Sequence, residues 1–176
     1  MDCLIVIDPQ MDFVSAEGAY ARRGHGTSNI RRCLGSIHQA LLNQEKHRIL
    51  VYSNYAANQF GPGLNLCIPG SPGHRIALSV ENFDTVLAKT DHDAIKSSEL
   101  PATLEQLRPR RIFLCGFLLE YCVRKTALSL LEAGWPVTIY EDLIATGDDV
   151  LERKITLIQE LESLGAVIGT ALATEN

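Results

Sequence analysis

The chain has 176 residues, of which 46% are hydrophobic and 21% are charged, and these ordinary globular values exclude a disordered or fibrous protein. The net charge is −5 and the basic residues form no dense patch, so nothing favours binding to nucleic acid. The longest mainly apolar run, residues 112–119, is far shorter than the ~20 residues that span a bilayer, which argues against a membrane protein.

Short apolar runs recur along the chain and predict six β-strands. The first, Cys3–Ile7, is apolar at every position, as is typical of a strand that is buried on both faces of a parallel sheet. The other five strands are expected at residues 49–52, 86–88, 112–117, 137–140 and 166–168.

Between these strands, apolar residues recur at helical spacing. The pattern predicts helices from Thr27 to about Gln44, over 100–107, over 121–133 and from Asp148 to Leu164. In the last helix, five residues should face the core: Leu151, Ile155, Ile158, Leu161 and Leu164. Residues 54–82 are rich in Gly and Pro without a clear period, so we expect a long ordered loop there.

The alternation of strand and helix is typical of parallel βαβ units with right-handed crossovers. We therefore expect a single domain over residues 1–176. Its fold class should be α/β, a three-layer α/β/α sandwich around a six-stranded parallel sheet with the Rossmann-like order 3-2-1-4-5-6.

The five cysteines include no C-x-x-C pair, and no basic stretch precedes the first apolar run. Both features are typical of a chain without a secretory signal, in which cysteines remain free thiols. We therefore expect a cytoplasmic protein without disulfides.

Several polar or reactive side chains follow strand ends, where sheets of this kind bind their ligands. Asp8 follows the first strand, Lys89 follows the third, and Cys122 lies shortly after the fourth; Glu141 and Asp142 follow the fifth. We expect Asp8, Lys89 and Cys122 to converge, with Lys89 reaching across an intervening strand. The start of a helix and the nearby lysine should then lower the pKa of the Cys122 thiol, against the opposing charge of Asp8.

Each of these residues also has an ordinary structural interpretation. Asp8 precedes a proline and is a typical turn former, Lys89 alone suits a solvated loop, and Cys122 alone suits an inert core position. The shared position at one edge of the sheet favours the functional interpretation over three unrelated structural ones.

Competing motifs are weak. No glycine-rich nucleotide fingerprint follows the first strand, and the five histidines lack metal-ligand spacing; His92, between two aspartates, is expected in an exposed loop. Loop 54–82 is expected to roof the pocket. Four aromatic residues are candidate substrate-binding walls, with ordinary core packing as the alternative: Phe13, Tyr20, Tyr55 and Phe60.

Four segments resemble, in order and spacing, the motifs of the isochorismatase-like cysteine hydrolase superfamily. Residues 6–13 (V-I-D-P-Q-M-D-F) resemble its opening [VI]-[VI]-D-x-Q-x-D-F. Residues 67–73 (C-I-P-G-S-P-G) and 89–95 (K-T-D-H-D-A-I) resemble its middle motifs, and residues 116–123 (G-F-L-L-E-Y-C-V) resemble its nucleophile segment. The resemblance extends over nearly the whole chain.

This resemblance implies a role for each strand-end residue. Cys122 would be the nucleophile, Asp8 the general acid/base that takes its proton, and Lys89 the cation that stabilises the charged pair. The resemblance also implies a cis peptide bond between Phe117 and Leu118. The main-chain N–H groups of Leu118 and Cys122 would then form an oxyanion hole.

Two departures narrow the activity that the resemblance implies. Nicotinamidases of the superfamily carry a metal-binding D-x-H after the second strand and a further His, whereas Ser53, Asn54 and Tyr55 stand here. We therefore expect no metal and no other cofactor. Members that hydrolyse the vinyl ether of isochorismate tend to lack the nucleophilic cysteine, but Cys122 is present. The expected activity is metal-independent hydrolysis of a small amide or ureide C–N bond through a cysteine thioester.

Three alternatives stay open at this point: a true vinyl-ether hydrolase, a non-catalytic oligomeric binding or scaffold protein of the same fold, and a redox sensor that acts through Cys122. The expected partners are a small-molecule substrate and further copies of the chain, in a dimer or tetramer. Neither nucleic acid nor a membrane is expected as a partner.

Overall fold

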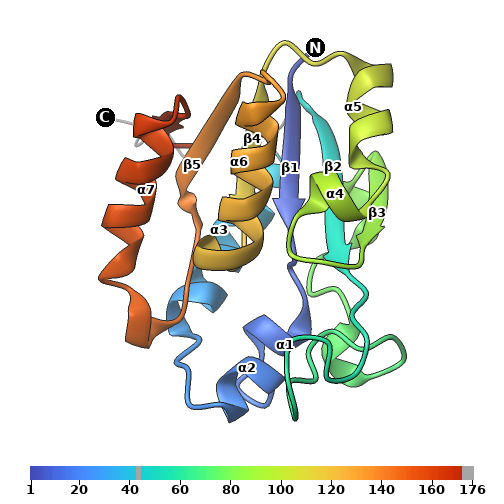
Figure 1. Cartoon of the computed structure of the whole chain (residues 1–176), viewed down its shortest axis with the longest axis vertical. Coiled ribbons are helices and arrows are strands. Elements are labelled where there is room, and N and C mark those ends of the chain that lie inside the picture. Colours follow the sequence, from blue (N-terminus) through green and yellow to red (C-terminus); the bar gives the residue numbers. More distant parts are fainter. Residues whose placement is uncertain (43–44, 172–176) are drawn as a thin grey trace.

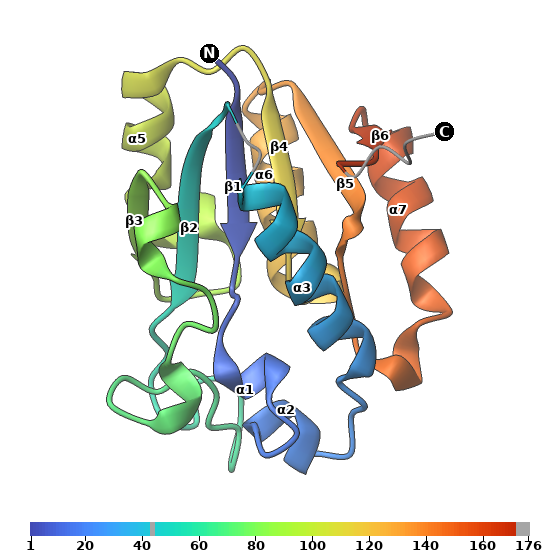
Figure 2. The ribbon, with the colours of Figure 1, turned by 180° about the vertical axis from the view of Figure 1, so that it is seen from behind.

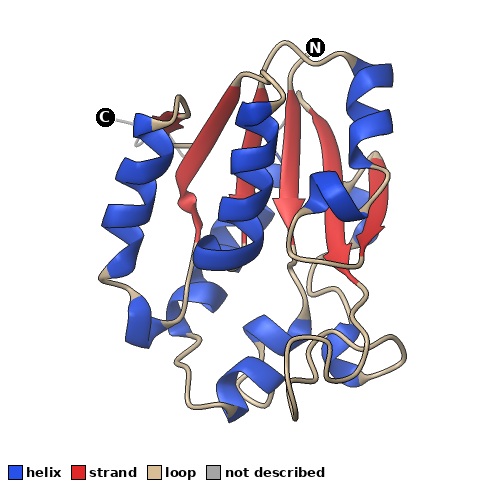
Figure 3. Cartoon of the chain, in the orientation of Figure 1, coloured by secondary structure: helices blue, strands red, loops and turns tan. Residues whose placement is uncertain are grey.

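The computed structural model describes residues 1–42 and 45–171, which form a parallel sheet between two layers of helices (Figures 1 and 3). The sheet has six strands in the order β3-β2-β1-β4-β5-β6, which confirms the predicted fold class and strand order. The strands are β1 (Cys3–Ile7), β2 (His47–Ser53), β3 (Thr85–Lys89), β4 (Ile112–Gly116), β5 (Val137–Ile144) and β6 (Val167–Gly169).

Strand β1 lies in the middle of the sheet because every one of its side chains is apolar and buried. Leu4 and Val6 pack into the core on one face, whereas Ile5 and Ile7 pack into the core on the other. Successive side chains of a strand point to opposite faces, so an uninterrupted apolar run requires cover on both sides. The carboxyl end of β1 therefore delivers Asp8 to the centre of the sheet edge.

Helices cover both faces of the sheet. Helix α3 (Ser28–Leu42) covers one face (Figure 2), and α4 (Ala94–Ser97), α5 (Leu100–Leu107), α6 (Arg124–Glu132) and α7 (Arg153–Ser163) lie on the other (Figure 1). Two short helices, α1 (Met11–Val14) and α2 (Ala19–Arg22), lie beyond the carboxyl ends of the strands. The expected end of the first long helix, residues 43–44, lies outside the described residues. None of the described helices has the length and apolar character needed to cross a bilayer.

The helix predicted from Asp148 is shorter than expected. A 3₁₀ turn, η4 (Asp148–Val150), precedes α7, because the Asp148 carboxylate accepts hydrogen bonds from the N–H groups of Ser28 and Asn29 and caps α3 instead. The predicted inward face is wrong at three positions, where the side chains are exposed: Leu151, Ile155 and Leu164. Ile158 and Leu161 are buried as predicted.

Strand β5 is longer than its sequence pattern indicates. Leu143 and Ile144 continue the buried face beyond the two acidic residues, and the register with β4 shifts between Leu114 and Gly116. Glu141 and Asp142 therefore lie within β5, and their expected place at its end is wrong.

Two side chains of the first motif tie loop 54–82 to the strand ends. Gln10 Nε2 donates to the carbonyl oxygens of Ser53 and His74, and its Oε1 accepts from the Ser53 N–H. The buried Asp12 carboxylate accepts from the N–H groups of Ala19 and Cys67, at 2.8 and 2.7 Å. The loop also contains two 3₁₀ turns, η1 (Pro72–His74) and η2 (Val80–Asn82).

Candidate active site

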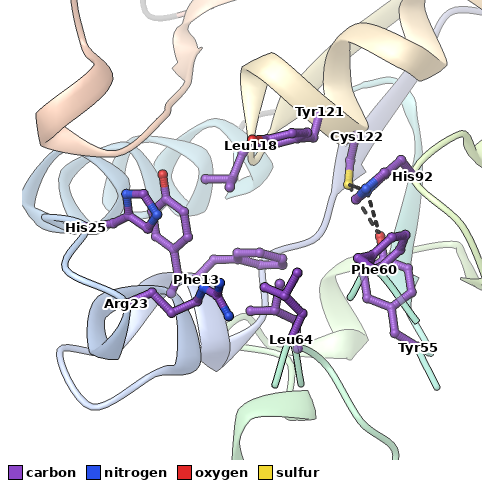
Figure 4. Close-up of a pocket in the computed structure, with 12 residues that line it drawn as sticks. Phe13, Arg23, His25, Tyr55, Phe60, Leu64, His92, Leu118, Tyr121 and Cys122 are labelled. Carbon is purple, nitrogen blue, oxygen red and sulfur yellow. Dashed lines mark hydrogen bonds between the residues drawn. The ribbon is translucent and has the colours of Figure 1, made fainter. Parts of the chain in front are cut away.

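A cavity of about 490 Å³ lies at the carboxyl edge of the sheet, between loop 54–82, α2 and the segment that follows β4 (Figure 4). All four aromatic residues singled out in the sequence line it, so their side chains are placed where a substrate could contact them. The lining residues are Phe13, Tyr20, Arg23, His25, Tyr55, Phe60, Leu64, Leu66, His92, Leu118, Tyr121 and Cys122. Most of these walls are aromatic or aliphatic, as in typical small-molecule sites.

The structure brings Asp8, Lys89 and Cys122 together beneath this cavity. Lys89 Nζ lies 3.0 Å from Asp8 Oδ2 and 3.5 Å from Cys122 Sγ, and all three side chains are buried. Strand β2 separates β3 from β1, so Lys89 does reach across one strand to meet Asp8. Of the three residues, only Cys122 lines the cavity, which makes it the one that a substrate can touch.

Ser53, at the end of β2, holds the ion pair in place. Its hydroxyl accepts a hydrogen bond from Lys89 Nζ at 2.7 Å and donates to Asp8 Oδ1 at 2.8 Å. Lys89 Nζ also donates to the Tyr55 hydroxyl and to the Asp91 carbonyl oxygen, at 2.7 and 3.0 Å. Asp8 Oδ2 is buried and, among the described residues, receives no hydrogen bond beyond the ion pair. The Asp8 carboxylate is therefore held between the Lys89 ammonium and the Ser53 hydroxyl.

The Cys122 thiol is neutral in this resting arrangement. Burial, and after it the Asp8 carboxylate, raise its pKa to about 12, although the Lys89 ammonium and the Tyr55 hydroxyl offset part of the rise. The expected lowering of this pKa is wrong because burial of the side chain outweighs the effect of the nearby lysine. Moreover, Cys122 lies in a π-helical turn, η3 (Leu119–Val123), rather than in the first turn of an α-helix as predicted. Attack by this sulfur therefore requires a base to remove its proton.

The neighbouring Lys89 keeps its charge. Burial alone would lower the pKa of the ammonium, but the Asp8 carboxylate beside it reverses the effect and the pKa is raised. A buried charge of this kind is tolerated only when a partner and further hydrogen bonds compensate its desolvation. The cluster thus holds one fixed positive charge beside the thiol and the carboxylate.

The opposing effects of the two charges on the thiol can be measured. Lys89→Met should raise the pKa of Cys122 further, whereas Asp8→Asn should lower it toward the ordinary range, because each variant removes one of the two charges. The pH dependence of iodoacetamide modification at Cys122, followed by peptide mass spectrometry, reports both shifts. The outcome that contradicts this assignment is the same pH profile in the wild type and both variants.

His92 contacts the nucleophile, although the sequence indicated an exposed loop position. Its Nδ1 lies 3.4 Å from Cys122 Sγ and 3.4 Å from the Tyr55 hydroxyl, and its ring stacks on Phe60 and Tyr121. Burial, together with the charges of Lys125 and Lys89, lowers the pKa of His92 to about 4, so the ring is neutral near pH 7. The expected exposed position of His92 is wrong, because packing against Phe60 and Tyr121 places its ring in the cavity wall.

The segment between β4 and Cys122 borders the cavity. The Phe117–Leu118 peptide bond is cis, and the Leu118 side chain lines the cavity beside Tyr121 (Figure 4). The N–H groups of Leu118 and Cys122 belong to the same short segment as the sulfur, so an oxyanion hole formed by these two groups remains a prediction.

The residues after β2 do not fit the metal site of nicotinamidases. The Ser53 hydroxyl donates a hydrogen bond to Asp8. The Asn54 Oδ1 atom is hydrogen-bonded to His74 Nε2 at 2.5 Å, and the Tyr55 hydroxyl accepts a hydrogen bond from Lys89. Within residues 1–42 and 45–171, no group of three or more His, Cys, Asp or Glu side chains could hold a metal ion. The side chains of Ser53, Asn54 and Tyr55 thus make hydrogen bonds to other residues.

Sequence reasoning missed several residues that shape the site. Ser53 stood at a predicted strand end without a role, and Gln10 and Asp12 were parts of a matched motif without a role. Their positions in that motif were the available signal. No local pattern marked Arg23 and His25, which reach the cavity from the chain that follows α2 (Figure 4).

A family model, a curated protein and several solved structures each match most of this chain. The family model of the isochorismatase domain matches residues 2–171. A streptothricin hydrolase from Streptomyces noursei is 29% identical over 150 residues, which cover 84% of this chain and 51% of that protein. The chain thus spans about half the length of this relative.

Several solved structures share the fold. PnC1 from L. infantum, in complex with nicotinate, has a TM-score of 0.83 and 24% identity, and the match covers 97% of this chain and 93% of that one. The pyrazinamidase of Pyrococcus horikoshii, in complex with zinc, has a TM-score of 0.78 and 21% identity, with 96% and 98% covered. N-carbamoylsarcosine amidase from Thermoplasma acidophilum has a TM-score of 0.77 and 17% identity, with both chains covered in full (100%).

Proposed function

Because this chain belongs to the isochorismatase family, we propose that it is a cysteine hydrolase that cleaves a small amide or ureide C–N bond through a thioester on Cys122. The observation that carries the proposal is the buried contact of Asp8, Lys89 and Cys122 at an apolar cavity. The relatives whose names include hydrolase or amidase support the same class of reaction.

In the first half of the reaction, Cys122 Sγ attacks the carbonyl carbon of the substrate. Asp8 takes the thiol proton as the S–C bond forms, and the carbonyl electron pair moves to oxygen. The N–H groups of Leu118 and Cys122 donate to that oxygen. As the intermediate collapses, the C–N bond breaks and Asp8 returns the proton to the leaving nitrogen. The products are ammonia or an amine and a thioester.

In the second half, Asp8 takes a proton from a water molecule, and the oxygen of that water attacks the thioester carbonyl. The C–O bond forms, the C–S bond breaks, and the proton returns from Asp8 to sulfur. Lys89 remains charged throughout and stabilises the Asp8 carboxylate in the states in which it is ionised. The neutral His92 ring, 3.4 Å from the sulfur, limits the directions from which water can approach.

Turnover on a panel of small amides and ureides, followed as release of ammonia or amine, tests this proposal. The wild type should hydrolyse at least one member, and Cys122→Ala should abolish that activity. Cys33→Ala is the matched control, because Cys33 is a buried thiol of α3 that does not line the cavity. Hydrolysis of isochorismate that survives in Cys122→Ala would instead indicate vinyl-ether chemistry.

We also expect turnover to be independent of a metal ion. The side chains of Asn54 and Tyr55 are engaged with His74 and Lys89, which leaves them in no position to act as a ligand set. Dialysis of the active enzyme against a strong chelator should leave kcat unchanged. Activity that disappears on dialysis and returns with a divalent metal would contradict this expectation.

A further inference from the structure

The cavity has a second polar end, opposite Cys122. One side of the cavity is formed by Cys122, Tyr55 and His92 (Figure 4). The opposite side is formed by Arg23 and His25. Two apolar side chains, Phe13 and Leu64, lie between these two groups. The chemistry described above uses only the first of these groups. A substrate that fills the cavity would therefore extend from the sulfur toward a cationic side chain.

Arg23 reaches this end from a fixed stretch of backbone. Its N–H donates to the Tyr20 carbonyl oxygen at the end of α2, and Gly24 follows with a φ of +92°, which turns the chain away. Within the residues that the structure describes, the Arg23 side chain makes no ion pair and one long hydrogen bond, 3.5 Å to the Gly63 carbonyl oxygen. Most of its five donors are thus available to a ligand.

The rest of the lining offers this cation no counter-charge. None of the described lining residues is acidic. The Asp149 carboxylate pairs with His25 Nδ1 at 2.9 Å, and the His25 ring stacks on Tyr20 with 4.2 Å between centroids. An anion at this end would face the Arg23 guanidinium, with the His25 ring beside it.

We propose that Arg23 binds a carboxylate of the substrate, so that the enzyme acts on amides that carry a negative charge at the end distant from the scissile carbonyl. The reaction named in this inference rests on the proposed function, whereas the binding of a carboxylate by Arg23 does not depend on it. A planar guanidinium can donate two parallel hydrogen bonds to a carboxylate, whereas the apolar walls favour an aromatic or aliphatic spacer between the two polar ends.

Binding to the Cys122→Ala protein tests the inference without requiring turnover. Isothermal calorimetry would compare three ligands that differ in one substituent: 4-carbamoylbenzoate, benzamide and 4-(aminomethyl)benzamide. The 3-carbamoyl isomer and glutaramate would allow for a different spacer. We expect the anionic ligand that fits best to bind roughly tenfold more tightly than its neutral counterpart. A charge-assisted hydrogen bond at a partly exposed site changes the dissociation constant by about that factor. The preference should weaken as salt is added.

The neighbouring Arg22 provides a matched control. Its guanidinium donates to the Glu17 carbonyl oxygen and lines a different depression of the surface, so Arg22→Ala changes the net charge equally but not this cavity. Arg23→Ala should remove the preference, and Arg22→Ala should retain it. The inference is wrong if no anionic ligand binds, if neutral or cationic ligands bind as tightly, or if both variants lose the preference equally. Wild-type turnover on the amide panel judges the proposed function separately.

Discussion

Replacement of Asp8 with Asn is expected to lower kcat/KM by about 10³-fold, because both halves of the proposed reaction need the same proton acceptor. The amide has nearly the shape of the carboxylate, so the cavity should retain its form. Steady-state kinetics on an amide that the wild type hydrolyses measures the loss. Asp84→Asn, which removes a carboxylate that pairs with Arg48 at a distance from the cavity, should leave kcat/KM unchanged.

The same substitution should also lower stability, and this effect can be separated from catalysis. Asp8→Asn leaves Lys89 buried without its partner, and Lys89→Met leaves Asp8 in the same state. Removing one member of a buried pair typically costs about 3–5 kcal/mol. The double variant Asp8→Asn/Lys89→Met should regain most of this free energy of unfolding in urea titrations yet remain inactive. An active double variant would refute the role of Asp8 as the base.

Gly116→Ala is expected to have the largest effect on folding. Gly116 ends β4 with a φ of +115°, and a Cβ atom there would lie 2.1 Å from the Ile7 carbonyl oxygen. Neither backbone can move easily, since Gly116 and Ile7 are paired in the middle of the sheet. We expect the free energy of unfolding to fall by about 4 kcal/mol or more, which is at the upper limit for single substitutions.

Gly35→Ala is the matched control for this substitution. Gly35 lies within α3, and an added Cβ meets nothing within 4 Å. Alanine favours a helix over glycine by about 0.5–1 kcal/mol, so this variant should be slightly more stable than the wild type. Urea denaturation followed by circular dichroism compares the two. Equal midpoints for Gly116→Ala and the wild type would show that the strand ends adapt more easily than their geometry indicates.

The central part of the fold was predictable because its signals are local. An apolar run such as Cys3–Ile7 has to be buried on both faces, and the end of such a strand places Asp8 at the sheet edge. A shorter apolar run, residues 86–88, placed Lys89 at the end of β3. The motif resemblance supplied the roles that composition and spacing could not assign, and those roles still require measurement.

The features that could not be predicted depend on contacts between distant segments. Asp148 caps α3, which lies far earlier in the chain, so its local pattern resembled the start of its own helix. His92 enters the cavity wall through stacking on Phe60 and Tyr121. The pKa of Cys122 is raised because the fold encloses the thiol, whereas sequence reasoning considered only the charges beside it.

The most direct test of the account is the capture of the acyl group on Cys122. The enzyme would be mixed with a hydrolysable amide, quenched with acid within a single turnover and digested for mass spectrometry. We predict an adduct with the mass of the acyl group on the peptide that contains Cys122, and no adduct on the peptides of Cys33 or Cys67. The account is contradicted if the adduct lies on another residue, or if Cys122→Ala hydrolyses the same amide at the wild-type rate.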